Sequence, residues 1–190
     1  MRKFLLSLIL FFCMFISISA QSQFLEKGHY GIMAVESTIF TEYNATVGGT
    51  FAISILGSVD LGVSGSNFRT NDLYGTKNST AMEVYTNIYV SRKKTNLALH
   101  VGIVNTGGTS GFAVGFGGNK NFQLSNNVKL QPSLSFALLY FSGSKSVTTS
   151  SSLSVSFDFL FYNHIIVSPG VGYSNQSFVE VLSIGALLGF

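Results

Sequence analysis

Apolar and polar residues alternate with a period of two along most of this chain. From Leu153 to Phe161 every odd-numbered residue is apolar, and three of the four residues between them are polar. The same alternation recurs over 43–55, 82–90 and 128–140. Successive side chains of a β-strand point to opposite faces, so this period predicts strands with one apolar face. No window shows a comparable helical period, and the chain is predicted to be all-β.

Turn-forming residues divide the pattern into about ten strands. We expect them near 27–38, 43–55, 58–67, 80–91, 97–105, 110–119, 127–141, 151–161, 165–174 and 178–190. An eight-stranded count, with the weak first strand and one other misread, is the alternative. Most connections are short, but polar stretches at 68–79 and 142–150 predict long loops. Short turns at one end and longer loops at the other are typical of up-and-down transmembrane barrels.

A soluble sandwich also alternates, so the composition of the polar face decides the class. Charged residues make up 10% of the chain, against roughly 25% in ordinary soluble domains. The polar face consists mainly of small residues, as at Gly62, Ser64 and Ser66. Small residues fit inside a narrow closed barrel, whose apolar face then meets lipid and whose backbone has no open edge. The sequence predicts a closed antiparallel transmembrane β-barrel.

Two features of the predicted outer face refine this interpretation. Aromatic residues in the apolar phase lie near both ends of the strands, as in the aromatic girdles of membrane barrels. They are Tyr43, Phe112, Tyr140, Tyr173 and Phe178 at one end, and Phe161 and Phe190 at the other. Pro132 and Pro169 fall within strands on the same face, where each removes a ladder donor and is expected to cause a local bulge.

The first twenty residues predict a secretory signal peptide, which leaves 21–190 as the barrel domain. Arg2 and Lys3 precede an apolar run that is shorter than the roughly 20 residues of a transmembrane helix. Ala20 is a small residue suited to cleavage before Gln21. The single cysteine lies within the signal, so thiol chemistry is excluded from the mature chain. Without the two signal cations the formal charge of +3 falls to about +1, and no nucleic-acid partner is expected.

The last strand ends in alternating apolar residues and a terminal aromatic, Phe190. This pattern resembles the C-terminal signature by which outer-membrane barrels are recognised for assembly. With the predicted signal and the alternation, the mature chain resembles the small outer-membrane β-barrel proteins of Gram-negative bacteria. The resemblance implies an outer-membrane location, contact with its lipid, and recognition of Phe190 by the barrel-assembly machinery. That superfamily includes narrow porins, hydrophobic-channel proteins, adhesion barrels and a few enzymes, so the resemblance does not choose an activity.

Four charged residues have the lumen-facing phase, and charges inside a barrel must be paired or hydrated. They are Asp60, Glu83, Lys129 and Asp158. We expect Lys129 and Asp158, on neighbouring strands, to form a salt bridge in the lumen. A polar constriction in a pore is the alternative. Most other inward positions are small, which predicts a narrow lumen that is not solidly filled.

No catalytic, cofactor or metal site is predicted. His29, His100 and His164 have no accompanying nucleophile, carboxylate or second ligand in a suitable pattern, and each is expected to be structural or solvated. An enzyme is therefore the least favoured function. The prediction is a structural or passive, narrow porin-like role for small solutes. The alternative is a surface adhesion barrel that binds a partner through 68–79 and 142–150.

Overall fold

The computed structural model describes residues 25, 27–40, 45–72, 75–92, 95–106, 109–142, 147–174 and 177–190. The predicted signal peptide and Tyr43 lie outside the described residues. The strands are β1 (Gly31–Phe40), β2 (Ala45–Ile55), β3 (Val59–Asp72), β4 (Gly75–Arg92), β5 (Asn96–Thr106), β6 (Thr109–Asn119), β7 (Phe122–Ser125), β8 (Val128–Ser142), β9 (Val147–Phe161), β10 (Ile165–Ser174) and β11 (Ser177–Gly189). The described part of the chain contains no helix long and apolar enough to cross a membrane.

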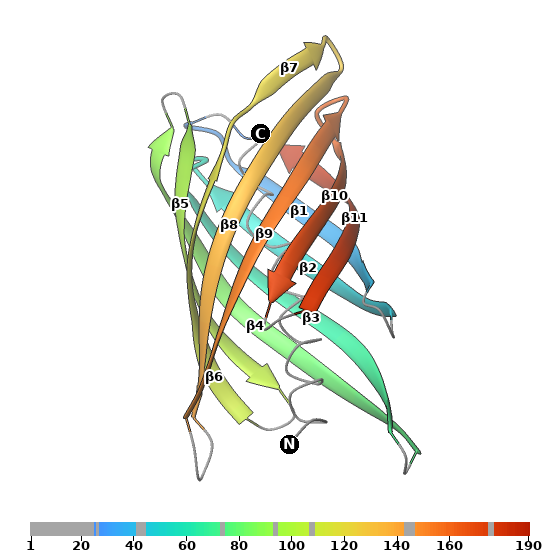
Figure 1. The fold of residues 1–190 in the computed structure, drawn as a ribbon. Coiled ribbons are helices and arrows are strands. Elements are labelled where there is room, and N and C mark those ends of the chain that lie inside the picture. Colours follow the sequence, from blue (N-terminus) through green and yellow to red (C-terminus); the bar gives the residue numbers. More distant parts are fainter. Residues whose placement is uncertain are drawn as a thin grey trace.

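These strands form one antiparallel sheet that closes on itself (Figure 1). β1 and β11 close the ring and pair along the whole of β1, from Gly31↔Gly189 to Phe40↔Glu180. β7 continues the path of β6, because β6 pairs with the middle of β8 and β7 with its start. The barrel is therefore ten-stranded, as predicted, and the eight-stranded alternative is wrong. We call the end that holds Phe190 the inner end and the opposite end the outer end.

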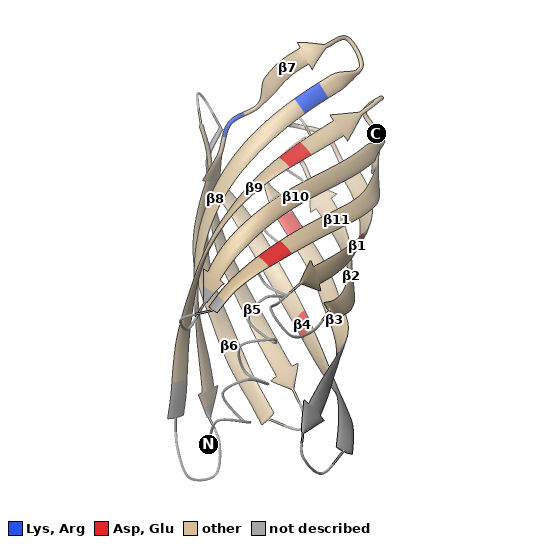
Figure 2. Cartoon of the chain, turned by 45° about the vertical axis from the view of Figure 1, so that its right-hand side comes forward, with Lys and Arg blue, Asp and Glu red and all other residues tan. Residues whose placement is uncertain are grey.

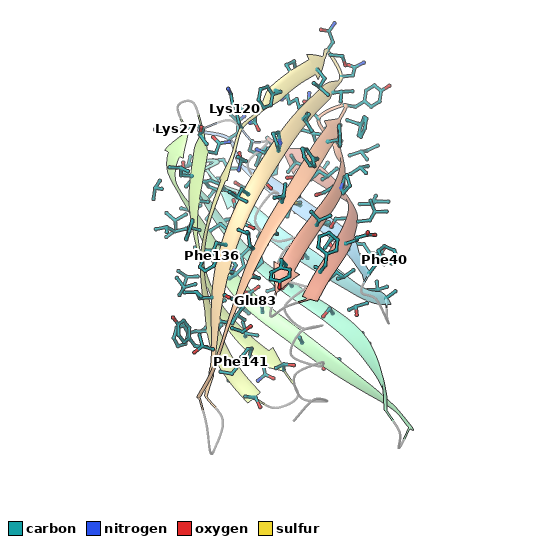
Figure 3. The ribbon with its side chains drawn as sticks, in the orientation of Figure 1. Lys27, Phe40, Glu83, Lys120, Phe136 and Phe141 are labelled. Atoms are coloured by element: carbon teal, nitrogen blue, oxygen red, sulfur yellow. The ribbon has the colours of Figure 1, made fainter. Side chains whose placement is uncertain are left out.

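The predicted division into an apolar outer face and a polar inner face is confirmed over most strands. On β9, Leu153 and Phe157 are exposed, whereas Ser154 and Asp158 are buried inside. Charged residues are sparse along the described strands (Figure 2). In Figure 3, Glu83 lies within the ring and Phe136 on its outside. This arrangement suits a barrel whose outer surface is solvated by lipid.

Aromatic side chains mark both ends of the outer wall. Near the outer end, Phe112 stacks on Tyr140 with ring centroids 4.7 Å apart, and Tyr173 pairs in register with Phe178. At the inner end the exposed Phe190 exchanges two backbone hydrogen bonds with Tyr30, each 2.9 Å long. Amphipathic rings at both membrane interfaces are expected of a spanning barrel.

Two outer connections differ from the prediction. β3 and β4 remain paired as far as Asp72↔Gly75, and β8 and β9 as far as Ser142↔Val147. Most of the predicted loops at 68–79 and 142–150 is therefore paired strand, apart from tips that lie outside the described residues. A hairpin that rises above the membrane has water on both faces, so its sequence carries no apolar phase to indicate a strand.

The expected bulges at the prolines are absent from the described pairings. Pro132 pairs with Phe157 in unbroken register. Pairing between β9 and β10 skips Pro169 but resumes without a shift. A missing proline N–H removes one ladder bond without inserting an extra residue, so the register is kept. The described register shifts occur instead between Tyr89 and Ser91 and between Gln123 and Ser125.

β1 places most of its apolar side chains in the lumen and a charged side chain on the outside, which is the opposite of the pattern in most strands. Met33, Val35 and Ile39 point inward and are buried, while Glu36 points outward and is exposed. The lumen consequently contains more large apolar side chains than predicted, and the expectation of mostly small inward residues is wrong on this side. The buried apolar cluster is Leu25, Met33, Val35, Ala52, Ala81, Tyr85, Val104, Ala113, Leu139, Phe141, Leu160, Ile166 and Leu187.

Candidate functional site: a polar network inside the barrel

A chain of polar side chains lines the lumen on β4 and β5. His100 lies directly opposite Asn87 in the strand register. Its Nδ1 is 2.8 Å from Asn87 Oδ1, and its Nε2 is 2.9 Å from Glu83 Oε1. The Glu83 side chain is fully buried, and that of His100 is 12% exposed. The alternation of β4 sends both of its residues to the same face as His100.

The hydrogen-bond chemistry fixes how protons are arranged in this chain. The Asn87 carbonyl oxygen can only accept, so Nδ1–H of His100 donates to it. One proton must then lie between Nε2 of His100 and Oε1 of Glu83, carried by either atom. With the proton on Nε2, a charged imidazolium donates to a carboxylate; with the proton on Oε1, both groups are neutral and the carboxylic acid donates. The hydrogen bond is kept in both forms.

Glycines on the flanking strands make room for the large members of the network. A Cβ placed on Gly102 of β5 would overlap Oε1 of Glu83. A Cβ on Gly62 of β3 would overlap the Tyr85 ring. Tyr85 thus covers the gap at Gly62 and lies beside His100, with ring centroids 5.4 Å apart. These glycines act as sockets that hold Glu83 and Tyr85 against the wall.

The network continues toward the inner end through a second carboxylate. Asp60 on β3 lies opposite Asn87 in register. The Tyr89 hydroxyl donates a 2.8 Å hydrogen bond to Asp60 Oδ2. Both side chains are buried in the lumen. A tyrosine donor stabilises a buried carboxylate without adding a second charge.

Hydroxyl groups line the facing wall formed by β8, β9 and β10. Ser133 and Ser156 bond across β8 and β9 at 2.6 Å, as do Ser135 and Ser154. Ser168 of β10 donates to Asp158. Serine hydroxyls both donate and accept, so this wall can exchange hydrogen bonds with water or a polar solute without a fixed charge.

An amide cluster lies at the inner end of the same wall. Gln131 Nε2 donates to Asn119 Oδ1 at 2.7 Å and to Asn121 Oδ1 at 2.5 Å. Asn96 also donates to Asn119 Oδ1, at 2.7 Å. The cluster joins β5, β6 and β8 and stiffens the ring where β6 gives way to β7.

The structure brings the predicted residues together differently from the expectation. Glu83 and Asp60 lie on one wall and Asp158 on the facing one. The predicted salt bridge between Lys129 and Asp158 is not formed, because the described side chains show no ion pair between these two residues, which lie diagonally across β8 and β9. Asp158 receives its hydrogen bond from Ser168 instead.

Each histidine is expected from sequence to be structural or solvated, and among those that the structure describes His100 is the one that joins a carboxylate in the lumen. Its inward phase could be read from the alternation, but its neighbour on β4 depends on a register that one strand's pattern does not contain. His29 and His164 are exposed near the inner end. The described residues contain no group of three or more His, Cys, Asp or Glu that could hold a metal ion.

A closed barrel with an apolar wall outside, aromatic rings at its two ends and polar groups inside is an outer-membrane β-barrel, and the chain is located in that membrane. No protein-family model matches the chain, and no curated protein matches it. Solved structures that match include the KdgM porin, with 7% identity, 81% of this chain and 98% of that chain covered, and a TM-score of 0.47. The β-domain of the Bordetella autotransporter BrkA matches with 10% identity, coverage of 87% and 100%, and a TM-score of 0.47. The N-terminal barrel of Pseudomonas aeruginosa OprF matches with 11% identity, coverage of 85% and 98%, and a TM-score of 0.36.

Proposed function

We propose that this barrel is a narrow, porin-like conduit for water and slender polar solutes. The observation that carries the proposal is the pair of facing polar walls, one built on Glu83, His100 and Asn87 and the other on serines of β8 and β9. A purely structural barrel could fill these positions with apolar side chains, as β1 does at Met33, Val35 and Ile39. Polar groups on both sides give a solute successive hydrogen-bond partners.

The Glu83–His100 pair is the proposed constriction. A cavity of about 20 Å³ lies between His100, Asn87 and Ser135. A second one, also of about 20 Å³, lies beside Glu83, Ser64 and Thr50. Each has room for about one water molecule. The expected conductance is therefore small.

Recordings in planar bilayers test this function with paired substitutions on one strand. Ser135→Trp places a bulky ring in the lumen beside His100, whereas Phe136→Trp changes the adjacent residue on the lipid face. Small conductance steps in the unmodified protein that Ser135→Trp reduces and Phe136→Trp leaves unchanged would support the conduit. A silent unmodified protein, with no solute flux into liposomes, would contradict it.

The two long outer hairpins favour a second candidate, the binding of a surface partner. β4 has 18 residues and β3 has 14, whereas β1 and β10 have 10 each. β8 and β9 have 15 residues each. Both hairpins therefore extend past the shorter strands at the outer end (Figure 1). Shortening either hairpin should abolish adhesion while conductance persists if the partner-binding function is correct.

A further inference from the structure

The outer wall around β1 differs from the rest of the lipid-facing surface. Glu36 lies at the middle of β1, points outward and is exposed. Glu180 of β11 also points outward, opposite Phe40. Among the side chains that the structure describes, these two carboxylates are the charged groups on the apolar wall between the aromatic ends. An ionisable group facing lipid at this depth is unfavourable unless something covers it.

The same wall contains a shallow, open hollow of about 630 Å³, which is also bordered by the larger side chains of Phe51, Val63 and Met82. Its outward lining includes Ala34, Glu36, Gly49, Gly65 and Ala186. A Cβ on Gly49 or on Gly65 would meet nothing nearer than 3.8 Å. These two glycines therefore relieve no clash, unlike the socket glycines of the lumen. Their effect is to leave the outer surface open at this place.

We propose that this surface, the β1 wall, is where two copies of the chain dock in the membrane. A two-fold axis parallel to the barrel axis and passing beside β1 brings the β2 side of one copy against the β11 side of the other. Leu182 and Ile184, which are exposed on β11, then enter the hollow at Gly49 of the partner subunit. Gly49 of β2 and Ile184 of β11 are the register partners of Glu36 on its two sides. The protruding Ile184 and the hollow at Gly49 therefore lie on either side of Glu36.

The polar groups of the β1 wall complement one another under the same symmetry. Thr38 follows Glu36 on the outward face of β1, and its hydroxyl can donate to a carboxylate. Across a two-fold axis between them, Thr38 of each copy donates to Glu36 of the partner subunit. Acyl chains can fill the hollow but offer no donor at mid-depth, whereas a second copy supplies both the apolar knob and the donor. Small residues allow the two walls to approach closely in lipid.

Site-specific crosslinking tests the dimer, and the mature chain is well suited to it because its one cysteine lies in the predicted signal. Thr38→Cys and Val114→Cys are compared in outer membranes with a short bis-maleimide. Val114 is exposed on β6, on the opposite side of the ring, and serves as the matched control. We expect severalfold more crosslinked dimer from Thr38→Cys than from Val114→Cys. Equal yields from the two variants, or an adduct with the mass of a different protein, would overturn the proposal.

A second set of variants separates contact from misfolding. Gly49→Leu, added to Thr38→Cys, should remove most of the crosslink by filling the hollow, while heat-modifiable migration shows that the barrel still folds. Val114→Leu, added in the same way, should change nothing. The Glu36 contact is tested with the cysteine at Ala34, an exposed outward residue of β1, so that the Thr38 hydroxyl is kept. In that background Glu36→Leu should reduce the crosslink, and Glu36→Gln, which keeps an acceptor oxygen, should reduce it less. A crosslink that survives Gly49→Leu in folded protein would also refute the two-fold contact.

Discussion

The socket at Gly102 offers the sharpest test of the lumen network. Gly102→Ala places a methyl group where Oε1 of Glu83 lies. Because the backbone of β5 is held on both sides by β4 and β6, the flexible carboxylate must move rather than the strand. We expect it to leave His100, its 2.9 Å partner.

The expected cost follows from the bond that is lost. A hydrogen bond to a charged group contributes about 1.5–3 kcal/mol, and a buried charge left without its partner costs about 3–5 kcal/mol. Partial rehydration through the neighbouring cavities should offset some of this. We therefore expect Gly102→Ala to lower the free energy of unfolding by about 2–4 kcal/mol.

Gly117→Ala provides a matched control, because it also adds one methyl group to an inward glycine. Its Cβ would meet Leu134 O at 3.3 Å and Ser135 Cβ at 3.4 Å, so a small adjustment accommodates it. The change should stay within about 1 kcal/mol. The assay is reversible unfolding by urea in lipid vesicles, read as a shift in the transition midpoint.

A double-mutant cycle identifies the cause of the loss. With Glu83→Ala already in place, the extra methyl group at Gly102 meets no carboxylate and should cost little. Equal losses from Gly102→Ala in both backgrounds would show that the cost lies in the strand and not in the Glu83–His100 pair. Equal stability of the Gly102→Ala and Gly117→Ala proteins would refute the socket altogether.

Three other predictions address the faces, the termini and the missing ion pair. Phe157→Arg should destabilise the barrel by about 2–4 kcal/mol, whereas Ser156→Arg can reach lumen water or Asp158; a larger loss from the second would reverse the assigned faces. Lys129→Gln should change unfolding by less than about 1 kcal/mol, since no ion pair is lost; a loss as large as that of Asp158→Ala would restore the predicted salt bridge. Mass spectrometry should show that mature protein begins at Gln21, and an intact Met1 in membrane fractions would exclude the cleavage. Deletion of Phe190 should lower the amount of protein in the outer membrane more than Phe190→Tyr does.

The strand count and most of the faces could be predicted from sequence, because the lipid itself imposes the signal. On β9, each outward residue from Leu153 to Phe161 is apolar since it must meet hydrocarbon. The prediction failed where that pressure is absent. The paired residues at 68–72, 75–79 and 147–150 extend past the ends of the shorter strands, and a polar composition is the same in a loop and in a solvated hairpin.

The lumen network could be predicted only in part. The inward phase of Asp60, Glu83 and Asp158 follows from the alternation within their own strands. Their partners depend on the register between strands. Lys129 is paired with Leu160, which is two residues along β9 from Asp158. The same dependence conceals the His100 contact, since β4 and β5 must be aligned before Asn87 and Glu83 can be placed beside the imidazole.

The reversal of β1 links the inside and the outside of the barrel. Because side chains alternate, placing Met33, Val35 and Ile39 in the lumen obliges Ala34, Glu36 and Thr38 to face outward. The lumen beside β1 is mixed, because Ser37 of β1 also points inward and shares a buried 2.8 Å hydrogen bond with Ser183 of β11. The outward carboxylate and the apolar lumen residues are two consequences of one strand. A variant that exchanged the inward and outward residues of β1 should therefore change both dimer formation and conductance.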